Sequence, residues 1–421
     1  MSLLSENFLQ KTIEPKFNAK VNILGLFTSK ILNNLTFEVP MKNILYTYSL
    51  LLLIVSFGCK SDKKEKAPLL TKQGKEVEIQ YASGLKITDF GDHKIITVEN
   101  PWPNADRTYR YLLAEEGATV PQDVKFDQRV QIPVKNIVVT STTHIPALEI
   151  LNSEELLVGF PGLDYISSEK TRSLITAGKV KELGKNEALN TESLLNLQPD
   201  VVIGFSVDGS NKSFNTLEKS GIPVVFNADW TESTPLGKVE WIKFFGAFLG
   251  KMDEANAFFE KVQEDYLSAK ELAKKAENKP DVVAGAMFKD QWYLPAGNSW
   301  QAIFIEDAHA NYLFGQTEGT GSLSLSFENV LTQAAHAHFW MGPAQFTAYE
   351  EMLQASPHYS RFEAFQEKNI YTFASEKGST GGVIFYELAP MRPDLVLKDM
   401  ISIFHPQLLP NYNTTFYKPL K

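Results

Sequence analysis

A single cysteine, Cys59, stands in this chain of 421 residues. One thiol cannot form an internal disulfide, a cysteine cluster or an iron–sulfur site, so it acts alone or with another molecule. The small residues Ser56 and Gly58 precede it and mark a possible cleavage point directly before the thiol. Cleavage there would make Cys59 the first residue of the mature chain.

The segment before Cys59 has the outline of an export signal. Lys42 follows Met41, and a short apolar run occupies residues 50–55. That run is too short to cross a bilayer comfortably, which favours a signal peptide over residues 41–58. We therefore expect translation to begin at Met41 and residues 1–40 to be an upstream extension that is not native. The alternative is an uncleaved apolar segment with an incidental thiol.

Two glutamates, Glu192 and Glu328, occupy matching positions in two similar segments. Each follows a helix-capping residue by two positions, Asn190 in one case and Ser326 in the other. A carboxylate in the first turn of a helix gains about 0.3 to 1 kcal/mol from the helix dipole, which explains either glutamate alone. The dipole does not explain their matched placement. The pattern predicts two exposed carboxylates at corresponding positions of related halves.

Other reactive residues carry little signal. His336 and His338 would share one face of a strand, but too few further donors follow to favour direct binding of zinc or manganese, which remains an alternative. Ser141 and His144 lie too close on one turn to act as nucleophile and base. The sequence also lacks Gly-x-Ser-x-Gly, His-Glu-x-x-His and phosphate-loop motifs, so a binding protein is predicted and a secreted enzyme is the weaker alternative.

Composition agrees with a large folded body. The chain is 43% hydrophobic and 12% aromatic, enough for two domains of ordinary size. Its 41 Lys plus Arg against 50 Asp plus Glu give a net charge of -9, which offers no attraction to phosphate backbones. A nucleic-acid partner is therefore not expected.

The pattern of elements indicates an α/β protein. Residues 76–134 alternate like strands and form a β-rich segment, the prelude; from residue 137 buried strands alternate with helices, as in a parallel sheet covered on both faces. Residues 253–277 could form one helix of roughly 35 to 40 Å. We expect two Rossmann-like lobes joined by a long rigid helix. The expected parts are a flexible tether 59–75, an N-terminal lobe 76–236 including the prelude, connecting helices 237–278, a C-terminal lobe 279–410 and a tail 411–421.

Several segments follow one another in a recognisable order between residues 135 and 406. They are Lys135-Asn136-Ile137-Val138-Val139, 148–159, Glu192-Ser193-Leu194-Leu195, 197–203, 220–224, 326–331, 392–399 and Phe404-His405-Pro406. Together with the leader and the mid-chain helix, this order resembles the substrate-binding proteins of bacterial ABC importers. The class is the one for iron-siderophores, haem and cobalamin, and the last segments resemble its members from Bacteroidetes-type bacteria.

The resemblance implies a function and an address. Such proteins hold a ligand between their lobes and deliver it to an ABC permease with its ATPase, and Glu192 and Glu328 match the glutamates that meet permease arginines. Gly58 and Cys59 resemble a lipobox, which implies a lipid on Cys59 that holds a periplasm-facing protein to a membrane of the cell envelope. We expect a monomer without an intrinsic cofactor, whose ligand is an iron chelate, haem or a corrinoid.

In such a fold the ligand contacts loops at the carboxyl ends of the strands. On that rule the candidate residues are Thr143, His144, Tyr165, Phe205, Trp292, Trp300, Trp340, Tyr386 and Arg392. Aromatic faces can cover a large planar ligand, and Arg392 could pair with an anionic chelate. Phe205 matches an aromatic position of cobalamin-binding relatives. Core packing is an equal alternative for each aromatic residue, and an axial haem ligand from Tyr165, His144 or Tyr386 is left open.

Overall fold

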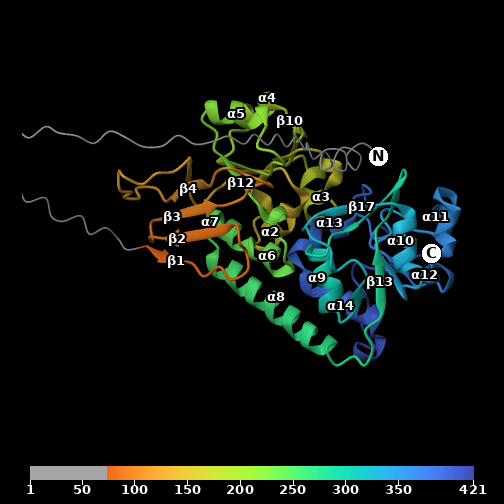
Figure 1. The fold of residues 1–421 in the computed structure, drawn as a ribbon. Helices are drawn as coiled ribbons and strands as arrows, with labels where there is room; N and C mark the ends of the chain where they lie inside the picture. Colours follow the sequence, from red (N-terminus) through yellow and green to blue (C-terminus); the bar gives the residue numbers. More distant parts are fainter. Residues whose placement is uncertain (1–73) are drawn as a thin grey trace, which may run out of the picture. The chain divides into compact units, whose positions relative to one another are not determined.

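The computed structural model describes residues 74–421. Cys59, the signal peptide expected over 41–58, the upstream residues 1–40 and the tether up to residue 73 lie outside the described residues. Within the described part, a β-rich segment comes first and two α/β lobes follow it (Figure 1).

The prelude forms a sheet of five strands in the order of the chain. Its strands are β1 (Lys75–Glu76), β2 (Leu85–Asp89), β3 (His93–Val98), β4 (Tyr109–Ala114) and β5 (Gln128–Gln131). Neighbours pair antiparallel except β4 and β5, which run parallel. In β2 the side chains of Leu85 and Ile87 are buried and that of Lys86 is exposed, so one face of the strand packs inward. The predicted β-rich prelude is confirmed.

The first lobe is built on a parallel sheet in the order β12-β11-β6-β7-β8. These strands are β6 (Ile137–Val139), β7 (Leu157–Phe160), β8 (Lys181–Glu182), β11 (Val201–Gly204) and β12 (Val224–Phe226), and a small hairpin of β9 (Gly184–Lys185) and β10 (Ala188–Leu189) lies beside them in the chain. Its helices are α2 (Ile145–Ile150), α3 (Glu169–Thr176), α4 (Thr191–Leu197) and α5 (Lys212–Lys219). Every residue of β6 and β11 is buried, as expected for strands covered on both faces.

The second lobe repeats this plan with the order β16-β13-β18-β19-β20. Its strands are β13 (Asp281–Ala284), β16 (Asn311–Tyr312), β18 (Phe339–Met341), β19 (Ile370–Thr372) and β20 (Lys418–Pro419), and a separate antiparallel sheet holds β14 (Ala286–Phe288), β15 (Gln291–Pro295) and β17 (Ser322–Leu325). Its helices are α9 (Trp300–Asp307), α10 (Phe327–Ala334), α11 (Tyr349–Ala355), α12 (Glu363–Gln366), α13 (Ile384–Leu388) and α14 (Pro393–Phe404). Because β20 pairs with β19, part of the segment expected as a tail completes this sheet.

The two lobes share one strand topology. The order β7-β6-β11-β12 in the first lobe corresponds to β16-β13-β18-β19 in the second, since each has the first strand of its lobe, β6 or β13, between the second strand and a later one. Helix α4 precedes β11 and helix α10 precedes β18. The two helices therefore occupy equivalent places, and the predicted relationship between the halves holds at the level of topology.

Three helices connect the lobes: α6 (Pro235–Glu240), α7 (Ile242–Leu249) and α8 (Met252–Ala273). Helix α7 ends at Gly250, whose φ of 67° gives a left-handed cap. Helix α8 has 22 residues and is about 33 Å long at 1.5 Å per residue. It packs against α7 of the first half and α14 of the second, and Figure 1 shows it as the longest helix drawn. The predicted connecting helix is confirmed, with its end at Ala273.

A buried carboxylate fixes the prelude to the connecting helices. The side chain of Glu240 is fully buried and accepts the backbone N–H groups of Gln80 at 2.9 Å, Tyr81 at 2.7 Å and Ala82 at 2.9 Å. The Lys243 ammonium also donates to it at 2.9 Å, which balances the buried charge. Irregular backbone can be buried here because one carboxylate serves three successive amides.

Glu232 extends this contact along the same segment. Its carboxylate accepts the backbone N–H of Ser83 at 3.1 Å and that of Gly84 at 2.9 Å. The indole N–H of Trp241 donates to it at 3.0 Å. Residues 80–84 are thus held by two carboxylates, Glu232 from the end of the first lobe and Glu240 from α6.

We predict that Glu240→Ala lowers the free energy of unfolding by about 3 kcal/mol, because it leaves three amides and a buried ammonium without their acceptor. Urea denaturation followed by circular dichroism measures the change. The matched control is Glu260→Ala on α8, where the side chain is exposed and the expected change stays within about 0.5 kcal/mol. Equal stabilities of the two variants would contradict the role given to Glu240.

Candidate functional site

Segments that follow the carboxyl ends of the sheet strands in the two lobes contact one another. After β6 comes the 3-10 helix η1 (Thr142–His144), and after β19 the chain reaches α13. Helix α13 packs against η1 and α2, and α6 packs against the 3-10 helix η6 (Ala389–Met391). The strand ends of both lobes therefore meet at one junction, which is where ligands bind in open α/β sheets.

Two exposed tyrosines border this junction, one from each lobe. Tyr165 belongs to the 3-10 helix η3 (Leu163–Tyr165) after β7 and is 51% exposed; Tyr386 belongs to α13 and is 48% exposed. Their segments are close, because a Cβ added at Gly382 would lie 2.9 Å from the Tyr165 carbonyl oxygen. The Gln345 amide donates to the Tyr386 hydroxyl at 2.9 Å. Both rings remain available to a ligand.

A buried positive charge from the first half reaches an aromatic ring of the second. Lys238 on α6 is 7% exposed, and its ammonium lies 5.4 Å from the ring centroid of Trp300. The same ammonium donates to the backbone oxygens of Asp229 and Trp230, each at 3.1 Å. Burial lowers the pKa of Lys238, and the Asp229 carboxylate opposes that shift. Trp300 itself is half-buried and stacks on Phe385 at 5.9 Å.

Several buried polar atoms near the strand ends have no hydrogen-bond partner in the structure. His144, which follows β6, has neither ring nitrogen paired, and Asn227 Nδ2 and Trp230 Nε1, which follow β12, are also unpaired. The hydroxyl oxygens of Ser167 and Ser375 are in the same state. An unpaired buried polar group costs roughly 1 to 3 kcal/mol, so such groups need a reason. A polar ligand or ordered water at the junction would supply one.

The first-lobe candidates differ in their exposure. His144 is fully buried, packs against Phe245 at 5.5 Å, and is neutral at pH 7 because burial lowers its pKa. Thr143 is half-buried, and its hydroxyl lies 2.9 Å from that of Ser141. Phe205 is half-buried after β11. Thr143 and Phe205 retain exposed surface, whereas His144 lies beneath it.

Trp292 and Trp340 lie in the core of the second lobe. Both are fully buried and stack on each other at 5.0 Å. Their indole N–H groups donate to the backbone oxygens of Ala284 at 2.9 Å and Gly285 at 2.8 Å. Core packing and satisfied hydrogen bonds account for these two residues, and neither has surface to offer a ligand in this structure.

Arg392 already has a strong partner. Its guanidinium makes two hydrogen bonds to Asp394, Nε to Oδ1 at 2.9 Å and Nη2 to Oδ2 at 2.7 Å. These bonds raise the pKa of Arg392. An anionic ligand would have to compete with a buried carboxylate for this charge.

Glu192 and Glu328 are exposed at equivalent places of the two lobes. Each is the second residue of its helix, α4 or α10. The side chain of Asn190 accepts from the Ser193 N–H at 3.0 Å, and that of Ser326 accepts from the Asn329 N–H at 3.2 Å, so both helices begin with the predicted caps. The two carboxylates therefore occupy equivalent positions, one in each of the two related lobes.

The histidine pair has other partners. The ring of His336 is exposed and lies 3.2 Å from Glu363, and His338 Nδ1 accepts the Asp281 N–H at 3.0 Å. Among residues 74–421, no three or more His, Cys, Asp or Glu side chains are grouped so as to hold a metal ion.

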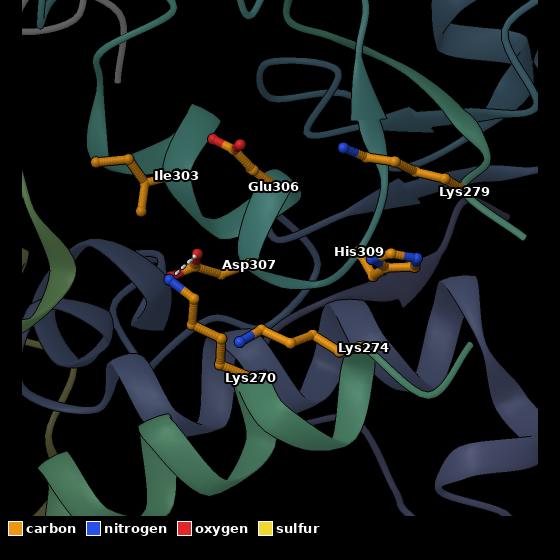
Figure 2. A pocket seen from close by; sticks show the side chains of 7 residues that line it. All are labelled: Lys270, Lys274, Lys279, Ile303, Glu306, Asp307 and His309. Carbon is orange, nitrogen blue, oxygen red and sulfur yellow. Dashed lines mark ion pairs between the residues drawn. The ribbon is translucent and has the colours of Figure 1, made fainter. Parts of the chain in front are cut away.

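A cavity of about 430 Å³ lies at the end of α8, away from the junction. Figure 2 shows its mostly polar lining: Lys270, Lys274, Lys279, Ile303, Glu306, Asp307 and His309. Asp307 is paired with Lys270 at 2.7 Å and accepts the Tyr266 hydroxyl at 2.6 Å. These contacts join α8 to α9, and we assign the cavity a structural role.

No helix between residues 74 and 421 is both long enough and apolar enough to span a membrane.

Comparison with known proteins identifies relatives and a fold. An uncharacterized lipoprotein of Methanocaldococcus jannaschii is 26% identical over 297 residues, covering 68% of this chain and 69% of the relative. A second uncharacterized lipoprotein of that organism is 24% identical over 397 residues, covering 86% of this chain and 96% of the relative.

Solved structures share the arrangement of elements. A possible iron-binding periplasmic solute-binding protein of Staphylococcus epidermidis has a TM-score of 0.51 at 17% identity, covering 65% of this chain and 99% of that one. CeuE of Helicobacter pylori with Ni(II) bound also scores 0.51, at 20% identity, covering 70% and 92%. A periplasmic heme binding protein of Pseudomonas aeruginosa scores 0.51 at 16% identity, covering 68% and 98%. These likenesses confirm the predicted two-lobed α/β fold.

A family model also matches the chain. The model of the family described as periplasmic binding protein matches residues 137–376, more than half of the chain. This family consists of binding proteins, which confirms the prediction of a binder and not an enzyme. The chain, with its two related lobes and its connecting helix, therefore belongs to the periplasmic binding protein family.

Proposed function

We propose that this protein is the substrate-binding component of an ABC importer, which captures an iron complex, haem or cobalamin between its lobes and delivers it to a membrane permease. The observation that carries the proposal is the pair Tyr165 and Tyr386, exposed aromatic rings that opposite lobes bring to one junction, where the buried Ser167 hydroxyl has no partner. Membership of a family of periplasmic binding proteins supports the capture role.

The chemistry of the junction favours a chelate over a free ion. Aromatic rings present faces that cover a flat macrocycle, and the buried charge of Lys238 suits an anionic group. A free zinc ion needs three or four converging nitrogen, sulfur or oxygen ligands, and the described residues contain no such group. Three structural neighbours are described as iron-binding, heme-binding or holding Ni(II), which supports a metal-containing ligand. For haem, the exposed phenols of Tyr165 and Tyr386 are the accessible axial candidates.

The proposal includes an arrangement of parts. The N-terminal lobe is 76–236 with the prelude, residues 237–278 connect the lobes, and the C-terminal lobe starts at 279 and includes β20 from the segment 411–421. A lipid on Cys59 would hold this body at a membrane as a monomer facing the periplasm, and two relatives named as lipoproteins support that anchor. Glu192 and Glu328 would face arginines of the permease.

Replacing Tyr165 or Tyr386 by alanine should weaken ligand binding about tenfold each, because a lost aromatic face corresponds to roughly 1.4 kcal/mol. Haem, a ferric siderophore and cyanocobalamin are titrated in turn, and quenching of tryptophan fluorescence reports the affinity. The ligand should bind one to one and be recovered unaltered. Phe126→Ala, which removes an equally exposed ring at 42% in the prelude, is the matched control. Unchanged affinity in both tyrosine variants would overturn the site.

The double variant Glu192→Lys with Glu328→Lys should abolish uptake and leave ligand affinity unchanged, since exposed charges set the register and rate of docking. Uptake is measured in cells of the native host that carry the variant in place of the natural gene. The control is Glu254→Lys with Glu260→Lys, which changes the net charge equally on exposed positions of α8. A normal uptake rate in the first double variant would refute the docking role.

A further inference from the structure

Residues 376–388, which we call the strap, run from β19 to the end of α13 in the second lobe. The strap lies on the loop 165–168 of the first lobe. The Glu387 carboxylate accepts the backbone N–H of Ser167 at 2.7 Å and that of Ser168 at 2.9 Å. One carboxylate of the second lobe thus accepts hydrogen bonds from two successive backbone amides of the first lobe.

Glycines let the strap approach the loop backbone directly. A Cβ added at Gly378 would lie 2.7 Å from Ser167 Cα, and one added at Gly382 would lie 2.6 Å from Ser167 Oγ. Real Cβ atoms do not come this close, so any side chain at Gly378 must push the two backbones apart. The hydroxyl of Thr380 also donates to the Ile166 oxygen at 3.4 Å. Shape and hydrogen bonding both fit the strap to the first lobe.

Glu387 is placed beside a second acid. Ser168 caps α3, and Glu149 on α2 accepts the Thr171 hydroxyl at 2.5 Å and also the Ser168 hydroxyl. The pKa of Glu387 is raised to about 7, chiefly by burial and to a smaller extent by the charge of Glu149, against the opposing effect of the two amide hydrogen bonds.

The other titratable groups near Glu387 come from elements packed on α13 and from the strap itself. Helix α2 supplies only Glu149, η1 supplies His144, which burial keeps neutral, and η6 has no titratable side chain. The strap adds Glu376, Lys377 and Tyr386.

We propose that the strap is a latch: the contact of Glu387 with the amides of Ser167 and Ser168 holds the junction closed, and ligand enters and leaves when the strap lifts. The latch rests on the proposed function in one respect, since it takes the junction between Tyr165 and Tyr386 as the ligand site. The contact between the lobes on which the latch depends stands on the geometry alone.

The latch is sensitive to pH with a defined sign. In the lifted state Glu387 is in water and has its ordinary pKa near 4.5, whereas in the closed state the pKa is about 7. The closed state therefore binds the proton more tightly, and its extra stability is complete below pH 4.5 and is lost as pH rises through 7. Lifting is coupled to release of the Glu387 proton.

Hydrogen–deuterium exchange of the ligand-free, full-length chain tests the latch. The amides of Ser167 and Ser168, corrected for their intrinsic exchange rates, should lose roughly tenfold or more of their protection between pH 5.5 and pH 8. Glu387→Gln is neutral at every pH and, like the protonated acid, has one carbonyl oxygen to accept an amide, so its protection should be equal at both pH values and close to that of the natural chain at pH 5.5. Glu376→Gln, which removes the same charge elsewhere on the strap, should behave as the natural chain.

A second pair of variants tests the same contact by shape. Gly378→Ala should lift the strap and lower protection of both amides at either pH, while Gly321→Ala, at a site with open space around it, should have no effect. If Gly378→Ala does not fold, the pH series on the natural chain and on Glu387→Gln decides the matter. Protection that is independent of pH in the natural chain and unchanged by Glu387→Gln would overturn the latch.

The rates of ligand association and release are measured separately. With haem as the probe, stopped-flow fluorescence should show faster association and faster release for Gly378→Ala than for Gly321→Ala. If haem, the ferric siderophore and cyanocobalamin all fail to bind, the proposed function fails while the exchange data still report on the latch. If a probe binds and its rates do not differ between the two glycine variants, the strap does not gate the site.

Discussion

The fold depends on carboxylates that bind runs of backbone amides in segments without regular structure. A buried N–H group without an acceptor costs free energy comparable to a lost hydrogen bond, so irregular segments can be buried only where acceptors are supplied. Glu240 and Glu232 supply them to residues 80–84. Asp399 on α14 does the same for Thr415, Phe416 and Tyr417 at 2.6 to 2.9 Å, which brings the end of the chain to the edge of the second sheet.

The contacts of Glu240 and Glu387 differ in how the charge of the carboxylate is balanced. This difference distinguishes a fixed contact from one that we propose to open. Glu240 is paired with the ammonium of Lys243, so the charge of its carboxylate is neutralised where it contacts the prelude. Glu387 is buried and faces the carboxylate of Glu149 instead, and burial, together with that negative charge, disfavours its ionised form. The first contact lies within one half of the molecule and the second joins the two lobes. A weakly balanced contact is suited to an interface that must open.

Much of the architecture follows from local pattern. Apolar runs followed by polar turns and helices predict the parallel sheets, the absence of turn residues predicts α8, and the caps at Asn190 and Ser326 predict the starts of α4 and α10. These features depend on neighbours in the sequence, which is why they are legible there. The contacts of Glu240 and Glu387 join residues more than 150 positions apart, and no spacing in the sequence signals them.

For single residues of the candidate site, local pattern does not predict whether the side chain lies in the core or at the junction. Trp292 and Trp300 are the same residue type in neighbouring segments, yet Trp292 lies inside a separate antiparallel sheet and Trp300 begins a helix at the junction. Trp340 lies within β18 and not beyond it, so its side chain enters the core. Lys238 reads as an ordinary surface residue of a helix, and only the packing of α6 between the lobes buries its charge.

The connecting helix restricts how this protein can admit a ligand. Helix α8 runs for 22 residues without glycine or proline and packs against both α7 and α14. A helix so held has no point at which it bends easily, so a large hinge motion of the lobes would break packing on both sides. The strap has the opposite character. It contains Gly378, Gly381 and Gly382, and Gly381 has a φ of 90°, a conformation that other residues rarely adopt. A rigid frame with one glycine-rich segment across its junction concentrates motion in that segment, and access to the site then requires only a local displacement.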